Sequence, residues 1–214
     1  MDITQLILDD HAEQRRLFAI LEQIDHADSA ALEAVWRRLA AFLEVHAAAE
    51  EEIFYPQLLR VGLSSGTAAG TEEETLDAIH DHNDIRDSIL AVAGHQPGSG
   101  GWYDAIAAVN VANGDHMAEE EREGLTDFRR RAGLQLRHEL AVAFTAFEAR
   151  NFGRVPIVDK DPESYVREAE REVAPARGAD SAGSTDSPGS TDSPGSTGSS
   201  DGSLRIGSLR GTQA

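Results

Sequence analysis

The stretch HAAAE at residues 46–50 recurs as HMAEE at residues 116–120, and this repeat decides the fold. A lone histidine precedes each copy, His11 in the first half and His82 in the second. The separation between the lone histidine and the motif is 46 − 11 = 35 in one half and 116 − 82 = 34 in the other. The halves themselves are offset by 82 − 11 = 71 and 116 − 46 = 70 positions, so the sequence predicts two helical hairpins of nearly equal size.

The expected turns lie midway between the paired histidines, because two residues of an antiparallel hairpin lie level when they are equally far from the turn. The midpoint of 11 and 46 falls at Asp28 and Ser29, whose side chains suit a helix N-cap. The midpoint of 82 and 116 is residue 99, within the glycine-rich stretch 94–101. Each lone histidine is therefore expected to face its HxxxE motif across a hairpin.

Apolar residues recur at helical spacing in all four arms of these hairpins. Val35, Leu39 and Phe42 lead to His46 in steps of four, three and four residues, which keeps one helix face inward. Capping boxes are expected at Asp2 with Gln5 and at Thr71 with Glu74. The sequence predicts an all-α fold, an up-down-up-down four-helix bundle with one histidine of each helix pointing inward.

Further elements are expected after the bundle. A fifth helix is predicted from about Leu134 until Asn151 and Gly153 end it, and Asp161 followed by Pro162 is typical of the start of a short helix. Residues 178–203 contain only Gly, Ser, Thr, Asp, Pro and Ala. We expect a metal-binding helical bundle at 1–152, an extension with a short helix at 153–175 and a disordered tail at 176–214.

Composition limits the classes of partner and ligand. The net charge of −19 argues against nucleic acid, which needs a basic surface. No apolar run reaches the roughly 20 residues that span a membrane, and no signal peptide is evident, so a soluble, cytoplasmic protein is expected. Because the chain has no cysteine, any metal must be bound by nitrogen and oxygen atoms.

The repeated motif has the chemistry of a metal site. Imidazole and carboxylate groups suit divalent ions, and residues four apart on a helix lie on the same side. Two ions that share two carboxylates and take two histidines each would keep coordination positions open for a small ligand. The predicted ligands are His11, His46, Glu50, His82, His116 and Glu120.

Two HxxxE motifs alone are weak evidence, because chance gives ~0.75 matches in a chain of this composition. The prediction rests on the matching positions of the histidines and motifs in the two halves. His82 is chosen over His80 because His82 shares an apolar stripe with Ile79 and Ile85. Glu51, Glu52 and the acidic run at residues 72–74 are interpreted as solvated helix faces.

These residues resemble the H…HxxxE…H…HxxxE signature of the hemerythrin-like (HHE cation-binding) proteins over residues 1 to about 150. Residues 51–56 (EEIFYP) also resemble the usual continuation of that motif. The resemblance implies a four-helix bundle holding two non-haem iron ions, which an oxo or hydroxo group can bridge. It further implies open positions where dioxygen, hydrogen peroxide or nitric oxide binds.

The sequence departs from the oxygen-carrying members of that family. The carriers have HxxxH on the third helix, where this chain has Arg86, and HxxxxD on the fourth, where this chain has Glu121 at the longer spacing. Tyr55 is a candidate phenolate ligand or proton donor, but an ideal helix places it about 140° from Glu50, which favours simple packing. Asn113 is a candidate for orienting a ligand or for satisfying a buried backbone group.

The leading hypothesis is a di-iron protein that reacts with small oxygen species, above all a catalase-like enzyme that decomposes hydrogen peroxide. The alternative is a non-enzymatic sensor or store of iron, dioxygen or nitric oxide, in which a protein partner reads the C-terminal tail.

Overall fold

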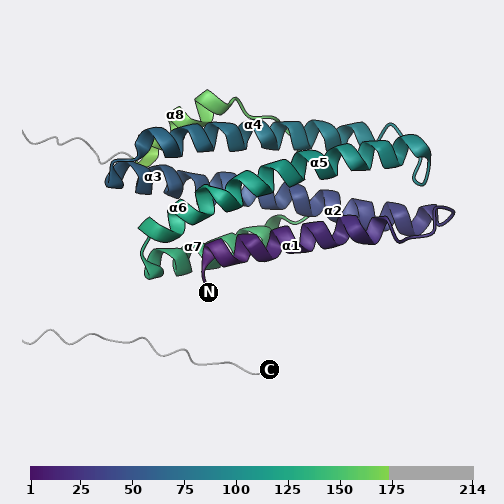
Figure 1. The fold of residues 1–214 in the computed structure, drawn as a ribbon, viewed down its shortest axis with the longest axis horizontal. Coiled ribbons are helices and arrows are strands. Elements are labelled where there is room, and N and C mark those ends of the chain that lie inside the picture. Colours follow the sequence, from purple (N-terminus) through teal and green to yellow (C-terminus); the bar gives the residue numbers. More distant parts are fainter. Residues whose placement is uncertain (174–214) are drawn as a thin grey trace, which may run out of the picture. The chain divides into compact units, whose positions relative to one another are not determined.

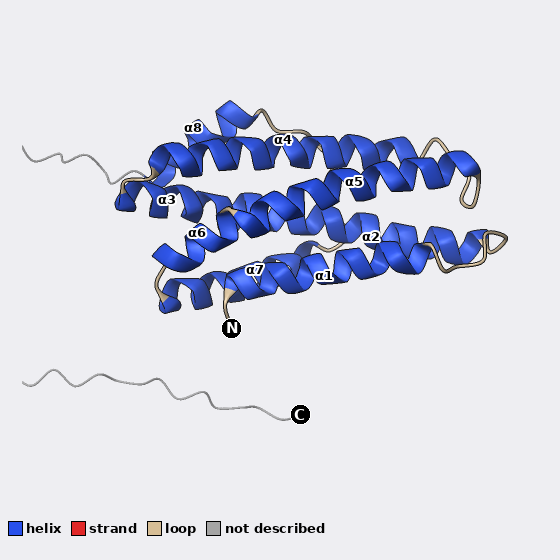
Figure 2. Cartoon of the chain, viewed as in Figure 1, coloured by secondary structure: helices blue, strands red, loops and turns tan. Residues whose placement is uncertain are grey.

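The computed structural model describes residues 1–173, which form a bundle of helices (Figures 1 and 2). The long helices are α1 (Ile3–Leu21), α2 (Ser29–Ala49), α4 (Ala68–Val92) and α5 (Gly100–Arg122). They run up, down, up and down as two hairpins, α1 with α2 and α4 with α5 (Figure 1). The predicted all-α four-helix bundle is thereby confirmed, whereas the tail expected at 176–214 lies outside the described residues.

Both predicted turns are confirmed by their helix caps. The Asp28 carboxylate accepts a hydrogen bond from the Ala31 amide at 3.0 Å, and the Ser99 hydroxyl accepts one from the Trp102 amide at 3.2 Å. Gly98 has a φ of 84°, and a Cβ atom at this position would lie 2.5 Å from the His26 carbonyl oxygen. The two turns therefore pack against each other at one end of the bundle, and only glycine fits at that contact.

The two expected capping boxes are wrong in detail. Asp2 caps α1 by accepting from the Thr4 amide, but the Gln5 side chain donates to Asp9 instead of reaching back. Helix α4 begins at Ala68, three residues before Thr71, and the Thr71 hydroxyl donates to the Ala68 carbonyl oxygen at 3.1 Å. Thr71 is buried inside the helix rather than at its start, because α4 packs closely against α3 there.

The second helix does not continue with regular α geometry beyond Ala49. A π-helical turn, η1 (Glu50–Phe54), joins α2 to α3 (Tyr55–Ser65), and the Tyr55 amide donates to the Glu50 carbonyl oxygen five residues back. Pro56 has no amide hydrogen to continue the regular ladder, which accounts for the irregular turn just before it.

Three further helices cover the end of the bundle that bears the N-terminus (Figure 1). They are α6 (Gly124–Arg131), α7 (Leu134–Asn151) and α8 (Pro162–Val173). Helix α7 ends where the sequence predicted, and the Asp161 side chain caps α8 by accepting from the Ser164 amide at 2.8 Å. Helix α6 was not foreseen. It begins after a change of backbone angle at Glu123, which ends α5.

Two apolar clusters flank a buried polar layer. One cluster is built around Phe54, Phe128 and Phe144, and the other around Trp102 and Leu39. In α1, α2 and α4 the inward histidine lies between residues of the first cluster and residues of the second, and His116 of α5 lies between second-cluster residues of its own helix and first-cluster residues of α6. The polar layer is thus sealed above and below by hydrophobic packing.

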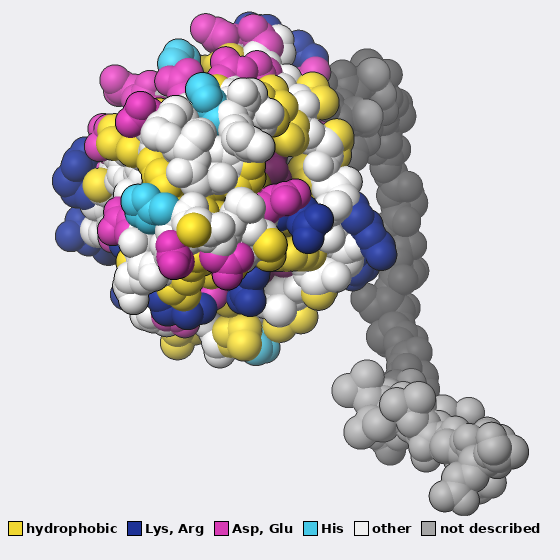
Figure 3. All heavy atoms as spheres, turned by 90° about the vertical axis from the view of Figure 1, so that its right-hand side faces the viewer, with side chains coloured by type: hydrophobic (Ala, Val, Ile, Leu, Met, Phe, Trp, Pro, Cys, Tyr) yellow, Lys and Arg dark blue, Asp and Glu magenta, His cyan; other side chains and the backbone are white. Residues whose placement is uncertain are grey.

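The surface carries mixed charge. Figure 3 views the end with the two turns, where acidic side chains are scattered among basic and hydrophobic ones. Among residues 1–173, no helix is both long enough and apolar enough to cross a membrane.

The close approach of α3 and α4 gives a stability test. A Cβ atom at Gly62 would lie 2.0 Å from the Thr71 hydroxyl oxygen and 2.9 Å from its Cβ, so no rotation of Thr71 relieves the clash. We expect Gly62→Ala to lower the free energy of unfolding by ~1–3 kcal/mol in chemical denaturation. Gly70→Ala is the matched control, because its Cβ meets nothing within 4 Å and should stabilise α4 slightly. Equal effects of the two variants would contradict the proposed contact.

Candidate metal centre

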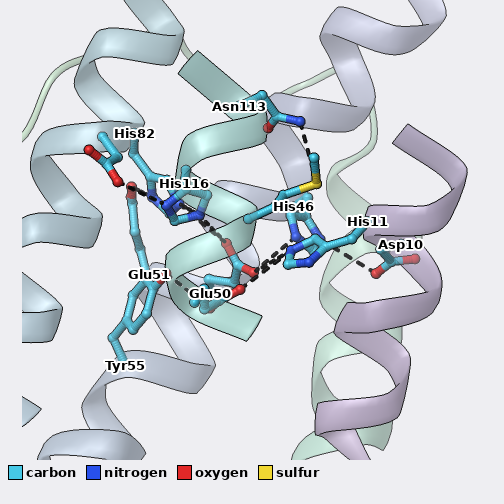
Figure 4. A network of polar contacts seen from close by, with 12 residues as sticks. Asp10, His11, His46, Glu50, Glu51, Tyr55, His82, Asn113 and His116 are labelled. Carbon is cyan, nitrogen blue, oxygen red and sulfur yellow. Dashed lines mark hydrogen bonds and ion pairs between the residues drawn. The ribbon is translucent and has the colours of Figure 1, made fainter. Parts of the chain in front are cut away.

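Four imidazoles and one carboxylate meet in the centre of the bundle (Figure 4). His11 comes from α1, His46 from α2, His82 from α4 and His116 from α5, and each is at most 4% exposed. Figure 4 shows all four rings turned toward Glu50, at the first position of η1. The inward stripes predicted from helical periodicity thus converge on one chamber.

Glu50 lies between two pairs of histidines. Its Oε1 atom is 2.9 Å from His46 Nε2 and 4.0 Å from His11 Nε2. Its Oε2 atom is 3.3 Å from His82 Nε2 and 4.0 Å from His116 Nε2. Two candidate metal triads result, each with one ligand atom per residue within 4.8 Å of the others, and they share this carboxylate.

The second predicted carboxylate, Glu120, is placed differently from Glu50. Its Oε1 atom accepts a hydrogen bond from the Tyr55 hydroxyl at 3.0 Å, and its Oε2 atom lies 3.4 Å from His11 Nε2. Glu120 is buried in the same chamber but belongs to neither triad. The two HxxxE motifs, equivalent in sequence, are therefore not equivalent in geometry.

His82 and His80 have opposite environments. The His82 side chain is 1% exposed and faces Glu50, whereas the His80 side chain is 69% exposed beside Asp84. The apolar stripe that led to the choice of His82 does identify the inward face of α4.

A carboxylate faces the outer nitrogen of each of these four histidines. The Nδ1-to-oxygen pairs are His11 with Glu121 (3.0 Å), His46 with Asp10 (3.4 Å), His82 with Glu51 (2.8 Å) and His116 with Asp81 (3.5 Å). Each carboxylate comes from a neighbouring helical segment, so the pairs form a closed ring around the bundle. A proton held on Nδ1 toward the carboxylate leaves the Nε2 lone pair directed at the centre, which is the arrangement that orients metal-binding imidazoles.

The sequence analysis did not predict these four carboxylates, although a signal for them exists. Asp10 and Asp81 directly precede the lone histidines, and Glu51 and Glu121 directly follow the motif glutamates. Their offsets between the two halves, 81 − 10 = 71 and 121 − 51 = 70, equal those of the histidines. The repeated unit is therefore Asp-His…His-x-x-x-Glu-Glu, longer than the motif first recognised.

The interpretation of Glu51 as a solvated residue is wrong, whereas Glu52 is exposed as expected. Glu51 is 2% exposed and accepts hydrogen bonds from His82 Nδ1 at 2.8 Å and from Arg86 at 2.6 Å. Burial alone would raise the pKa of Glu51, but the His82 hydrogen bond and the charges of Arg86 and Lys160 lower it to about 2. Glu51 is therefore an anion held against the outer face of His82.

The π turn brings Tyr55 to the centre. Because η1 has a wider turn than an α-helix, Tyr55 does not face away from the chamber but is fully buried, with its hydroxyl on Glu120. Burial raises the pKa of Tyr55 well above its usual value, and the Glu120 and Glu50 carboxylates raise it further. Simple packing, the favoured alternative for this residue, does not describe it.

Asn113 fulfils neither of its two suggested roles. Its side-chain amide donates to Gln14 Oε1 at 3.0 Å and lies 3.6 Å from Met117 Sδ. This link joins α1 to α5 one helical turn away from the histidines.

The comparison with known protein families identifies the family to which the chain belongs. The model of the hemerythrin HHE cation binding domain matches residues 2–125, more than half of the chain. The chain belongs to this family. No curated protein and no solved structure matches it.

Hemerythrin-family domains bind metal ions, typically iron, and the chamber of this member fits such an ion. His11 Nε2, His46 Nε2, Glu120 Oε2 and both carboxylate oxygens of Glu50 are buried without a hydrogen-bond partner. Buried polar atoms are rarely left unsatisfied, and a bound cation between them would satisfy all five.

This hemerythrin-family member has an ion pair where oxygen carriers have a further histidine. Arg86 is 3% exposed, donates to Glu51 at 2.6 Å and lies 3.6 Å from Glu44. Its guanidinium fills the space beside His82 and cannot bind a cation. At this position the chain therefore has Arg86, which holds the Glu51 carboxylate in place, and not a further nitrogen ligand.

Separate substitutions of the two neighbouring histidines test the ligand set. We expect His82→Ala to lower the amount of iron bound per chain, because one of the two candidate triads loses a nitrogen donor. His80→Ala should leave the iron content unchanged, since that ring faces solvent. The measurement is metal analysis of protein reloaded with ferrous iron after chelation, and a loss confined to His80→Ala would overturn the assignment.

Proposed function

We propose that this hemerythrin-family protein holds two non-haem iron ions and reacts with small oxygen species, hydrogen peroxide being the substrate that it decomposes. The observation that carries the proposal is the pair of buried triads sharing Glu50. His11 and His46 would hold one ion, and His82 and His116 the other. Glu50 would bridge the two ions, and Glu120 would reach the centre from the side of Tyr55.

The small size of the cavity beside the centre supports the proposal that the substrate is a small molecule. A cavity of about 30 Å³ beside the centre is lined by Tyr55, His116 and Glu120. Glu74, Asp77 and Glu119 also line it. Such a volume holds water or a molecule of similar size, such as peroxide, dioxygen or nitric oxide. The acidic lining disfavours anions and is compatible with these neutral molecules.

Peroxide decomposition needs two electrons and two protons to move between two peroxide molecules. One peroxide loses both to become dioxygen, while the other gains both as its O–O bond breaks to give two waters. Two bound iron ions would supply the redox capacity for this two-electron exchange. The protein must supply the geometry and the proton carriers.

Tyr55 and Glu120 are suited to carry the protons. The raised pKa of Tyr55 keeps its hydroxyl protonated at neutral pH, and that hydroxyl donates to Glu120 Oε1. The other carboxylate oxygen of Glu120 accepts no hydrogen bond and faces the chamber beside His11. A proton can therefore pass between a phenol and a carboxylate that both line the access cavity.

The experiment starts from full-length protein that has been chelated and reloaded anaerobically with ferrous iron. We expect about two irons per chain, a visible absorption band after addition of dioxygen or peroxide, and evolution of oxygen from peroxide. Glu50→Ala should abolish all three, because both triads lose their shared oxygen, and His138→Ala is a control outside the chamber.

The outcomes separate the hypotheses. A spectrum that changes with dioxygen or nitric oxide, without turnover of peroxide, would favour the non-enzymatic sensor or store. Failure of the wild-type protein to bind iron would contradict both hypotheses.

Replacing Tyr55 tests the proton path. We expect Tyr55→Phe to retain iron but to decompose peroxide about 100-fold more slowly, the usual loss when a general acid is removed. Tyr103→Phe is the matched control, because its ring packs with Trp102 in the apolar cluster far from Glu120. Unchanged turnover in Tyr55→Phe would exclude the phenol from the reaction.

A further inference from the structure

The segment after α7 contacts the metal centre from outside the matched family domain. Residues 160–173, here called the C-terminal strap, comprise Lys160, Asp161 and helix α8 and lie along α3 and α4 (Figure 1). Val166 and Ala169 anchor the strap by packing against Leu59 of α3. Lys160 and Tyr165 project from it toward Glu51.

The strap satisfies a carbonyl group that the π turn leaves without a partner. In regular α geometry the Tyr55 amide would donate to the Glu51 carbonyl oxygen, but here it donates to that of Glu50. The next residue, Pro56, has no amide hydrogen, so the ladder offers no other donor. The Tyr165 hydroxyl donates to the Glu51 carbonyl oxygen instead.

The same residue of η1 is also held by its side chain. Glu51 Oε1 accepts from His82 and Arg86, while Oε2, which accepts no hydrogen bond, lies 2.7 Å from Lys160 Nζ. The carboxylate is thus fixed by the bundle on one side and by the strap on the other. Its position determines which way the His82 ring presents Nε2 to the centre.

Loss of the Tyr165 hydroxyl has a defined structural consequence. The Tyr55 amide is then the nearest backbone donor that can satisfy the Glu51 carbonyl oxygen, and taking it restores an α-helical turn. An α-helical turn carries the Tyr55 side chain to about 140° from Glu50 and so away from Glu120. The π turn therefore has two supports, the missing amide hydrogen of Pro56 and a hydrogen bond from a helix that lies far later in the chain.

We propose that Lys160 and Tyr165 are positioning residues of the metal centre: through Glu51 they fix the His82 ring and the π turn that presents Tyr55 to Glu120. This inference rests on the metal centre proposed above. It assigns a part of that centre to a segment beyond residues 2–125.

Tyr165→Phe tests the backbone contact, because it removes one hydroxyl and keeps the aromatic ring. We expect ferrous iron, measured by competition with a chelator, to bind about 10-fold more weakly, as when an outer partner of a metal ligand is lost. The visible spectrum of the iron-loaded protein after peroxide should change as well. Tyr103→Phe, which also loses one tyrosine hydroxyl, should match wild type in both measurements.

Substitutions of Lys160 test the side-chain contact independently, because one variant removes the charge and another restores it. Lys160→Met keeps the length of the side chain but removes its charge, and iron affinity should again fall by up to about 10-fold. Lys160→Arg restores a cation near Glu51 Oε2 and should recover most of the affinity. Arg171→Met, at an exposed site on α8 of the same strap, is the control for loss of one positive charge.

Thermal unfolding separates positioning from a general loss of stability. Because Val166 and Ala169 still anchor the strap, metal-free Tyr165→Phe and Lys160→Met should melt close to metal-free wild type. The increase in melting temperature caused by iron should shrink in both. Equal losses with and without iron, or an unchanged affinity and spectrum, would overturn the inference while leaving the proposed function intact. Absence of iron binding in wild type would overturn both.

Discussion

The bundle buries four imidazoles and their carboxylate partners at its centre, and the rest of the structure depends on how these charges are satisfied. A buried ion costs several kcal/mol unless it is paired and hydrogen-bonded. Each outer carboxylate is paired with the Nδ1 atom of a histidine, and the Nε2 atom of that histidine faces an inner carboxylate or a candidate cation position. Apolar clusters on both sides exclude water, which strengthens every interaction in the layer.

Much of this arrangement was predictable because its signals are local. The histidine spacings, the caps at Asp28 and Ser99 and the apolar stripes each follow from the regular geometry of helices. The choice of His82 over His80 needed only the position of neighbouring isoleucines on the same helix. These features also suffice to suggest the hemerythrin family, whose matched domain covers residues 2–125.

The unpredicted part depends on irregular geometry and on distant partners. The regular spacing of 3.6 residues per turn does not hold across η1. Tyr55 therefore lies on the inward face of the helix, beside Glu120, and not on the outward face that regular spacing predicts. Glu51 looked solvated because its sequence neighbours are acidic. Its actual partners are His82 and Arg86 on α4 and Lys160 beyond α7, all of them on other segments of the chain. No local pattern reports contacts of that separation.

The ring of outer carboxylates has a consequence for the symmetry of the fold. Two of its pairs, Asp10 with His46 and Asp81 with His116, lie within a hairpin. The other two, in which Glu51 and Glu121 are the carboxylates, cross from one hairpin to the other. Such a pattern maps onto itself when the halves are exchanged, so two identical copies of one hairpin, associated about a twofold axis, would reproduce every pair. A homodimer of such a hairpin would therefore hold a complete ring of outer carboxylates, and the non-equivalence of Glu50 and Glu120 is where the two halves of this chain depart from that symmetry.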